Sequence, residues 1–196
     1  MAHSSSSSRR KFLAPAVLMP MMAALPAAFA APAPKGKVLV AVFSRSGNTR
    51  VIAGQIHRMY DAPLFEIAPA RAYPEDYLET VEQARQETAK GFKPPLKAKV
   101  ADLAGVETIF LGFPIWGTTA PPVIRSFLAE HDLKGKTIIP FITHGGYGLG
   151  NSLKILAADA PGVKLVDQGL VMQADQERKT MERVNDWLGK LKKATT

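Results

Sequence analysis

A short polar segment offers the clearest chemistry in the sequence: Ser44-Arg45-Ser46-Gly47-Asn48-Thr49. Its hydroxyl and amide side chains are short hydrogen-bond donors, and its glycine lets the backbone come close to a ligand. The residues after it have helical spacing, so a helix beginning here would add free amides and the positive end of its dipole. The segment therefore predicts a phosphate-binding loop, with a polar turn that only caps the helix as the alternative. It has no Walker lysine, which argues against a nucleoside triphosphatase.

A second segment, residues 113–122, holds a tryptophan between proline and glycine. Trp116 follows an apolar run, so we expect it just after a strand, where an indole ring would be placed to stack on a planar ligand. Gly117 leaves the neighbouring peptide free to change its orientation. Packing of Trp116 into the core is the alternative interpretation.

A third segment, residues 143–151, is rich in glycine and also follows an apolar run. Its four glycines between positions 145 and 150 indicate a backbone that approaches a ligand closely and offers its amides as donors. His144 is a candidate counter-charge for an anionic ligand or a residue that orients the loop through a hydrogen bond. A loop that is only flexible is the alternative.

The elements around these segments predict the fold. Apolar runs without polar alternation indicate strands buried on both faces, expected over residues 38–43, 108–113, 137–143 and 163–172, with a mixed edge strand over 64–68. Helical spacing predicts helices over 49–60, from 74 to about 90, from 121–122 onwards, after Gly150, and over about 175–193. Strands that alternate with helices predict a doubly wound α/β domain. Because ligands bind at the carboxyl ends of such strands, the three segments should meet at one edge.

The first thirty residues predict an export signal. Ser8-Arg9-Arg10-Lys11-Phe12-Leu13 resembles a bacterial twin-arginine signal, and an apolar stretch then leads to Ala28-Phe29-Ala30. We expect cleavage after Ala30, a periplasmic location, a linker over 31–36 and a folded domain over 37–193. A retained membrane anchor is the alternative, but prolines interrupt the apolar stretch, so no stable membrane span is expected after cleavage.

Composition excludes several classes of site. The chain has no cysteine, which rules out disulfides, thiolate catalysis and cysteine-bound metal centres. Its net charge is +8, but the lysines and arginines are scattered, which favours a solvated surface over a nucleic-acid site. His3, His57 and His131 have no partners at metal-ligand spacing, so we expect them on the surface or in the signal, and we expect no metal site.

Taken together, the three segments resemble the flavodoxin family along residues 37–191. The likeness is strongest to flavodoxin-like proteins with Gly-Phe-Pro-Ile-Trp, here residues 112–116, and Thr-His-Gly-Gly-x-Gly-Leu-Gly-Asn, here residues 143–151. The resemblance implies a three-layer α/β/α fold with a doubly wound five-stranded parallel sheet in the order 2-1-3-4-5. The run over 163–172 leaves no room for the segment that long-chain flavodoxins insert, so the chain looks short-chain in type.

The resemblance also implies FMN as the cofactor. Carried over by position, the cofactor-binding residues would be Ser44, Arg45, Ser46, Gly47, Asn48 and Thr49 in the phosphate segment, and Pro114, Ile115, Trp116, Gly117, Thr118, Thr143, His144, Gly145, Gly146 and Tyr147 around the isoalloxazine ring.

Three functions are compatible with this reading. The favoured one is a flavodoxin that carries electrons between redox partner proteins, whose identity the sequence leaves open together with the oligomeric state. An FMN-dependent NAD(P)H:quinone or nitro reductase on the same fold is the second, although no G-x-G-x-x-G motif for a nicotinamide cofactor follows. A binding module that has lost FMN is the third, and the complete phosphate segment argues against it.

Overall fold

The computed structural model describes Met1, residues 37–174 and residues 177–193. The predicted twin-arginine signal (1–30, apart from Met1) and the linker over 31–36 lie outside the described residues. The elements, in chain order, are β1 (Lys37–Val42), α1 (Asn48–Tyr60), β2 (Leu64–Glu66), α2 (Tyr77–Ala89), β3 (Val106–Pro114), α3 (Pro122–Glu130), β4 (Thr137–His144), α4 (Ser152–Asp159), β5 (Lys164–Leu165), β6 (Leu170–Gln173) and α5 (Glu177–Lys193).

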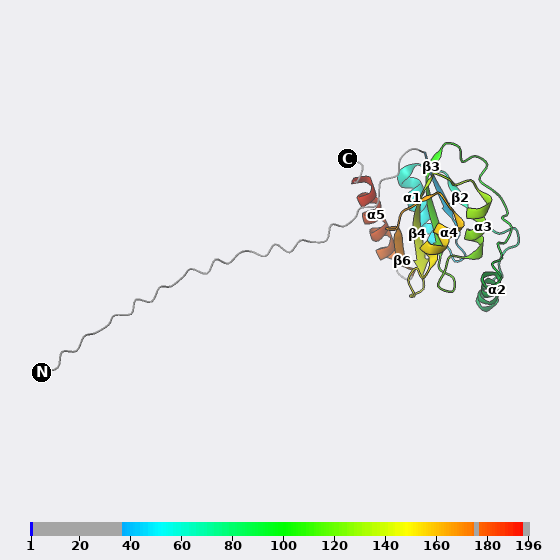
Figure 1. Cartoon of the computed structure of the whole chain (residues 1–196), viewed down its shortest axis with the longest axis horizontal. Coiled ribbons are helices and arrows are strands. Elements are labelled where there is room, and N and C mark those ends of the chain that lie inside the picture. The colour runs from blue at the N-terminus through cyan, green and yellow to red at the C-terminus, as the bar shows by residue number, and fades with distance from the viewer. Residues whose placement is uncertain (2–36, 175–176, 194–196) are drawn as a thin grey trace.

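A parallel sheet forms the centre of the domain (Figure 1). Its strands lie in the order β2-β1-β3-β4-β5. Both β5 and β6 pair with β4: β5 with the first two residues of β4, and β6 with its last four. The three middle strands, β1, β3 and β4, are the continuous apolar runs of the sequence, and most of their residues are buried. The predicted doubly wound sheet in the order 2-1-3-4-5 is confirmed, with the mixed run at 64–66 on its edge as expected.

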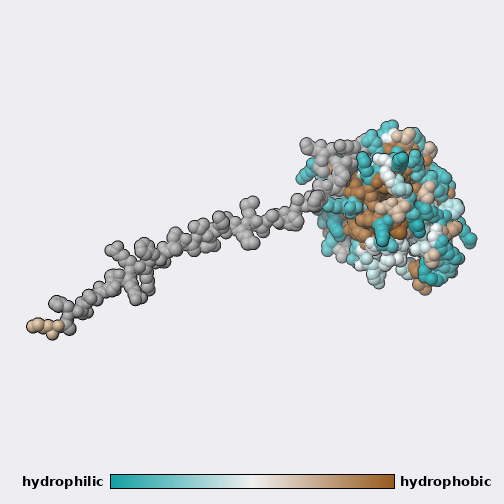
Figure 2. All heavy atoms as spheres, viewed as in Figure 1, coloured by the Kyte–Doolittle hydropathy of each residue, from teal (hydrophilic) through white to brown (hydrophobic). Residues whose placement is uncertain are grey.

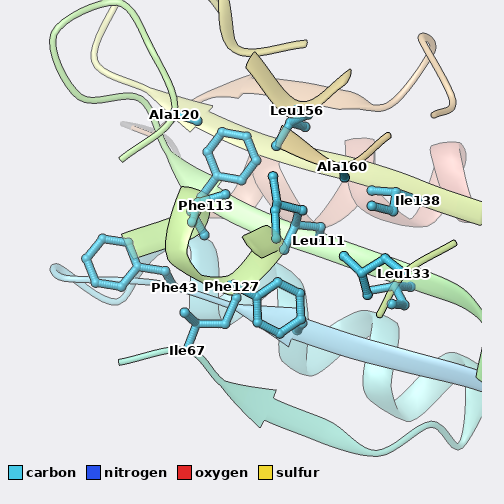
Figure 3. Packing of buried hydrophobic residues seen from close by; sticks show 14 of the residues in the cluster. Phe43, Ile67, Leu111, Phe113, Ala120, Phe127, Leu133, Ile138, Leu156 and Ala160 are labelled. Carbon is cyan, nitrogen blue, oxygen red and sulfur yellow. The ribbon is translucent and has the colours of Figure 1, made fainter. Parts of the chain in front are cut away.

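Helices cover both faces of this sheet and enclose two apolar cores. On one face, α1 contributes Ile52 and Ile56, and α5 contributes Val184 and Leu188. On the other face, α3 and α4 pack against β1, β3 and β4; Figure 3 shows Phe127 and Leu156 among the strand residues of this core. On the face of the domain seen in Figure 2, hydrophilic residues surround an exposed hydrophobic area.

The last strand differs from its prediction as one run over 163–172. It is split into β5 and β6, and residues 166–169 between them do not belong to either strand. In β4, the Ile138 carbonyl accepts from the Val166 N–H and the His144 carbonyl accepts from the Ala174 N–H. Alternate residues of a strand direct their backbone groups to the same neighbouring strand, so those of Pro140 also face the outer strand. Proline has no N–H to donate, and its carbonyl oxygen would lie 2.1 Å from a Cβ on Gly169. The break between β5 and β6 therefore lies opposite Pro140, and we attribute it to this proline in the neighbouring strand.

A long connection between β2 and β3 carries α2 away from the sheet, as Figure 1 shows. Its two ends are joined at the base, where the Ala70 N–H donates to the Pro95 carbonyl and the Lys97 N–H to the Ala68 carbonyl. The helix was predicted to begin at Pro74 but begins at Tyr77, because the Asp76 carboxylate accepts from the Glu79 N–H and caps it there.

His131 was expected on the surface, and this prediction was wrong. Its side chain is half-buried: Nε2 accepts from the Val100 N–H at 3.0 Å and Nδ1 bonds to the Phe127 carbonyl at 2.8 Å. The ring thereby fastens the connection before β3 to the end of α3. Among the described residues, no helix combines the length and apolar character that a membrane span requires.

Gly112 in β3 provides a test of the side-chain packing between β3 and β4. A Cβ at this position would lie 2.1 Å from ring carbons of the fully buried Phe141 in β4. We expect Gly112→Ala to lower the free energy of unfolding by about 1–3 kcal/mol, because the core has no space for a methyl group. Urea denaturation measures this. Gly54→Ala in α1 is the control: its Cβ meets only an Arg58 side-chain atom at 3.4 Å, so it should be neutral or stabilising. Equal destabilisation by both variants would contradict the packing argument.

Candidate functional site

The segment 44–49 forms the end of the turn after β1 and the first two residues of α1. Gly47 adopts φ +92°, in the left-handed region that favours glycine, and space around its Cα is open. Gly47, the residue before α1, makes no side-chain hydrogen bond that would cap the helix, and the first turn contains no acidic residue. The Ser44 Oγ is buried and has no hydrogen-bond partner among the described residues. An uncapped helix start beside an unpartnered hydroxyl suits an anion that accepts hydrogen bonds.

Thr49 has a different position from its neighbours in the segment. It is buried, and its Oγ1 lies 2.8 Å from Oγ1 of Thr143, the residue before the end of β4. This hydroxyl pair joins the start of α1 to the carboxyl end of a strand two positions away in the sheet. Thr49 thus fixes the loop that presents Ser46 and Asn48.

The tryptophan segment forms a tight turn after β3. Trp116 and Thr119 exchange backbone hydrogen bonds of 3.0 and 3.1 Å, and the two residues between them, Gly117 and Thr118, have φ of +53° and +66°. This pair of positive φ angles is typical of a two-residue type I′ turn. Such an angle costs free energy at Thr118, which carries a branched side chain, so neighbouring structure must hold the turn in place.

Trp116 is half-buried and packs partly into the core, while its stacking on a planar ligand stays a prediction. One side of the ring packs edge-on against Phe43, with ring centroids 5.2 Å apart, and against Tyr73 at 4.8 Å. The residue also lines the cavity described below. The indole ring therefore has two aromatic neighbours and also borders a ligand-sized space.

Tyr73 links this tryptophan to the long connection that carries α2. Its hydroxyl donates to Oε2 of Glu87 at 2.8 Å, and the Gln83 amide donates to Oε1 of the same buried carboxylate. Burial, then the hydrogen bond and the charge of Glu87, raise the pKa of Tyr73 well above its usual value, so the hydroxyl keeps its proton. Because Tyr73 contacts both Glu87 of α2 and Trp116, it fixes the position of α2 relative to Trp116.

The glycine-rich segment is held by one of its own side chains and by the tryptophan turn. The Gly146 N–H donates to His144 Nδ1 at 3.1 Å, so His144 orients the loop, one of the two roles expected for it. The Asn151 N–H donates to the Thr118 carbonyl at 3.1 Å, which joins this segment to the tryptophan turn. At Gly150, with φ +54°, an added Cβ would lie 1.9 Å from that carbonyl oxygen. Only glycine permits this approach.

A cavity of about 760 Å³ opens where the three segments meet, at the carboxyl edge of the sheet. The predicted site residues that line it are Arg45, Ser46, Asn48, Pro114, Ile115, Trp116, Gly117, Thr143, His144 and Gly145. A smaller cavity of about 350 Å³ shares Ser46, Asn48 and Thr143 with it and adds Gly47. The structure thus brings together residues from all three segments.

The remaining predicted residues lie outside both linings: Ser44, Thr49, Thr118, Gly146 and Tyr147. The Tyr147 side chain is 86% exposed, pointing to solvent rather than to the cavity. Thr118 contributes through its backbone carbonyl, as described above.

Sequence reasoning missed one wall of the larger cavity. This wall comes from α2, with a contribution from Ala174 after β6, and consists of Tyr77, Thr80, Val81, Ala84, Arg85, Thr88 and Ala89. The available signal was a stripe of residues at helical spacing, Tyr77, Val81, Ala84 and Thr88, directly after the cap at Asp76. That pattern alone does not distinguish a cavity wall from a core-facing side.

Comparison with known proteins agrees with this geometry. The flavodoxin family model matches residues 37–191, nearly the whole described domain. The chain belongs to the flavodoxin family. Among solved structures, a candidate flavoprotein of Bacteroides uniformis is 33% identical, with a TM-score of 0.69 over 79% of this chain and 98% of that one. A candidate flavoprotein of Bacteroides eggerthii is 30% identical, with a TM-score of 0.66 over 79% and 99% of the two chains.

A more distant flavoprotein from Lactobacillus acidophilus, solved in complex with FMN, shares the fold. It is 20% identical, with a TM-score of 0.63 over 78% of this chain and 99% of that one. A comparison with curated proteins gave no match.

Gly150 provides a test of the hydrogen bond between the glycine-rich segment and the tryptophan turn in this flavodoxin-family protein. We expect Gly150→Ala to lower the free energy of unfolding by at least about 1 kcal/mol more than Gly148→Ala. Both glycines have positive φ, so both variants carry that strain, but only at Gly150 does a Cβ meet the Thr118 carbonyl. Hydrogen exchange should also show faster exchange of the Asn151 amide in Gly150→Ala alone. Identical stability and exchange in the two variants would show that the close approach has no structural role.

Proposed function

We propose that this protein binds FMN across the larger cavity and the smaller one that shares Ser46, Asn48 and Thr143 with it, and transfers electrons through this cofactor. The observation that carries the proposal is the uncapped start of α1, where Gly47 opens the backbone and the buried Ser44 hydroxyl lacks a partner among the described residues. These groups fit a phosphate, which accepts several hydrogen bonds and is stabilised by the positive end of a helix dipole. The family and the FMN complex of the Lactobacillus acidophilus flavoprotein support the choice of FMN.

The lining residues would divide between the parts of the cofactor. Ser46, Gly47 and Asn48 would hold the phosphate, and Trp116 with Gly145 would adjoin the flavin ring. FMN supplies the ability to take up and release one or two electrons, and the protein supplies position and surroundings. The edge-on contacts of Trp116 with Phe43 and Tyr73 would keep the indole ring at a fixed orientation toward the ring system.

The turn at Gly117 and Thr118 gives the site backbone groups next to the flavin. Gly117 is exposed, lines the cavity and has open space around its Cα, so its backbone is accessible to a ligand there. His144 already accepts a hydrogen bond from the Gly146 N–H, which favours its role in holding the loop over that of a counter-charge. We assign electron transfer between redox partners as the function, with an NAD(P)H-dependent quinone or nitro reductase as the alternative.

Ser46 tests the phosphate site directly. We expect Ser46→Asp to weaken FMN binding at least about tenfold, because a carboxylate beside the helix start repels the phosphate. Fluorescence titration of the protein freed of flavin would measure the affinity. Ser46→Asn has nearly the same shape without the charge and serves as the matched variant.

Riboflavin, which has no phosphate, is the matched ligand. Its affinity should be the same in the protein with Ser46 and in Ser46→Asp. An equal loss of riboflavin and FMN binding would place the effect on the ring rather than on the phosphate. Unchanged FMN binding would refute the phosphate assignment.

We further propose that the protein is exported to the periplasm by the twin-arginine route. The Arg9-Arg10 pair, the apolar stretch after it and the small residues before position 31 support this. That route carries folded proteins, so FMN would enter the site before export.

Cell fractionation tests the route. In a strain with the twin-arginine machinery, the mature protein should reach the periplasm and begin at Ala31. In a strain that lacks the machinery, and for Arg9→Lys combined with Arg10→Lys, the precursor should remain in the cytoplasm. Unchanged arrival in the periplasm of the deficient strain would contradict the proposal.

A further inference from the structure

One hydrogen bond inside the glycine-rich segment depends on the protonation state of a side chain. The Gly146 N–H donates to Nδ1 of His144 at 3.1 Å, and the two residues have the same spacing as the partners of an Asx turn. An imidazole nitrogen accepts a hydrogen bond only while it has no proton of its own, and the charged ring has an N–H at both nitrogens. Protonation of His144 at Nδ1 would therefore set one N–H against another and break this contact.

The part of the segment next to His144 has few other contacts that hold it. Residues 145–148 form no other hydrogen bond within the described part of the chain. Space around the Gly145 Cα is open, and the Tyr147 side chain is 86% exposed. The segment is fastened again at Asn151, whose N–H donates to the tryptophan turn. Because glycines leave the backbone many conformations, loss of the contact would free residues 145–148 beside the cavity that Gly145 lines.

The charged groups around His144 are cations. Among the described residues, neither cavity is lined by a carboxylate, while Arg45 of the phosphate segment and Arg85 of α2 line the larger one together with His144. Gln173 of β6, which pairs with His144 in the sheet, is uncharged, and Arg183 of α5 bonds to the β6 backbone. A bound FMN phosphate would attract the charged ring, but solvent and salt screen that attraction, whereas the hydrogen bond is lost outright. Acidification should therefore weaken the site.

We propose that His144 is a proton-sensitive positioning residue of the flavin site: only its uncharged ring holds the glycine-rich segment in the form that binds FMN, so the protein binds FMN more weakly as the pH falls. This inference rests on the proposed FMN site and adds its regulation. Histidine is the side chain that ordinarily changes charge between about pH 5 and 8, so the response is expected in this range.

The FMN affinity at pH values from about 5 to 8 tests the inference, in the flavin-free protein and in His144→Asn. The asparagine Oδ1 can accept from the N–H two residues further on, as in an Asx turn, but asparagine does not titrate. We expect affinities within about twofold of each other at about pH 8, and at about pH 5 at least about fivefold weaker binding with His144 than with asparagine. The FMN phosphate also changes charge, at about pH 6, but it does so equally for both proteins and leaves the ratio of their affinities unchanged.

His57→Asn is the matched control. His57 lies in the last turn of α1, and its Nδ1 bonds to the Ala62 carbonyl, an acceptor that a charged ring also satisfies. This variant should keep the full pH response. The titration of His131, whose Nε2 also accepts from a backbone N–H, contributes equally to all three proteins. Affinities are compared over the pH range in which near-UV circular dichroism shows all three to be folded.

NMR spectra of the flavin-free protein follow the segment itself. The amide signal of Gly146 should shift with pH in the protein with His144 and stay constant in His144→Asn. A ratio of FMN affinities that stays constant over the pH range, with FMN bound at its upper end, would overturn the role of His144 and leave the FMN proposal standing. Relatively tighter binding by the protein with His144 at low pH would make the residue a counter-charge instead. A protein with His144 that binds no FMN at any pH overturns both proposals.

Discussion

Two backbone hydrogen bonds join the tryptophan and glycine-rich segments beside the cavity: the Ile115 N–H donates to the Thr143 carbonyl, and the Asn151 N–H donates to the Thr118 carbonyl. The second one depends on a close approach of two backbones. It requires Gly150, since a Cβ there would lie 1.9 Å from the carbonyl oxygen, and it offsets part of the cost of the positive φ at Thr118. The hydrogen bond holds the turn at Gly117 and Thr118, and this turn positions Trp116 beside the cavity. The cavity wall therefore depends on a contact between backbones, which no side-chain motif records.

The phosphate segment is coupled to the same framework from the other side. The hydroxyls of Thr49 and Thr143 meet at the end of β4, and the Arg45 guanidinium reaches the residue before the cap of α2. Each of the three loops is thus bonded to an element that is distant in sequence. Such cross-links keep a site open in the absence of ligand, which reduces the ordering cost when a ligand binds.

The sheet and the convergence of the loops could be predicted from sequence because both follow from local patterns. Apolar runs mark buried strands, and the loop after each one must lie at its carboxyl end. The break opposite Pro140 could not be predicted, since it depends on which residue of the neighbouring strand faces the proline. The wall formed by Tyr77 and Val81 was missed because its position is set by the contacts of Tyr73 and Arg45, which join residues far apart in the chain.

The interrupted last strand also affects how the molecule behaves among its copies. A sheet with open edges exposes unpaired N–H and C=O groups, onto which another chain can add a strand. Here one edge is formed by β2, of three residues, and the other by β5 and β6, of two and four residues with a turn between them. Neither edge offers a long straight ladder. Pro140, by dividing the outer strand, protects the protein against edge-to-edge aggregation.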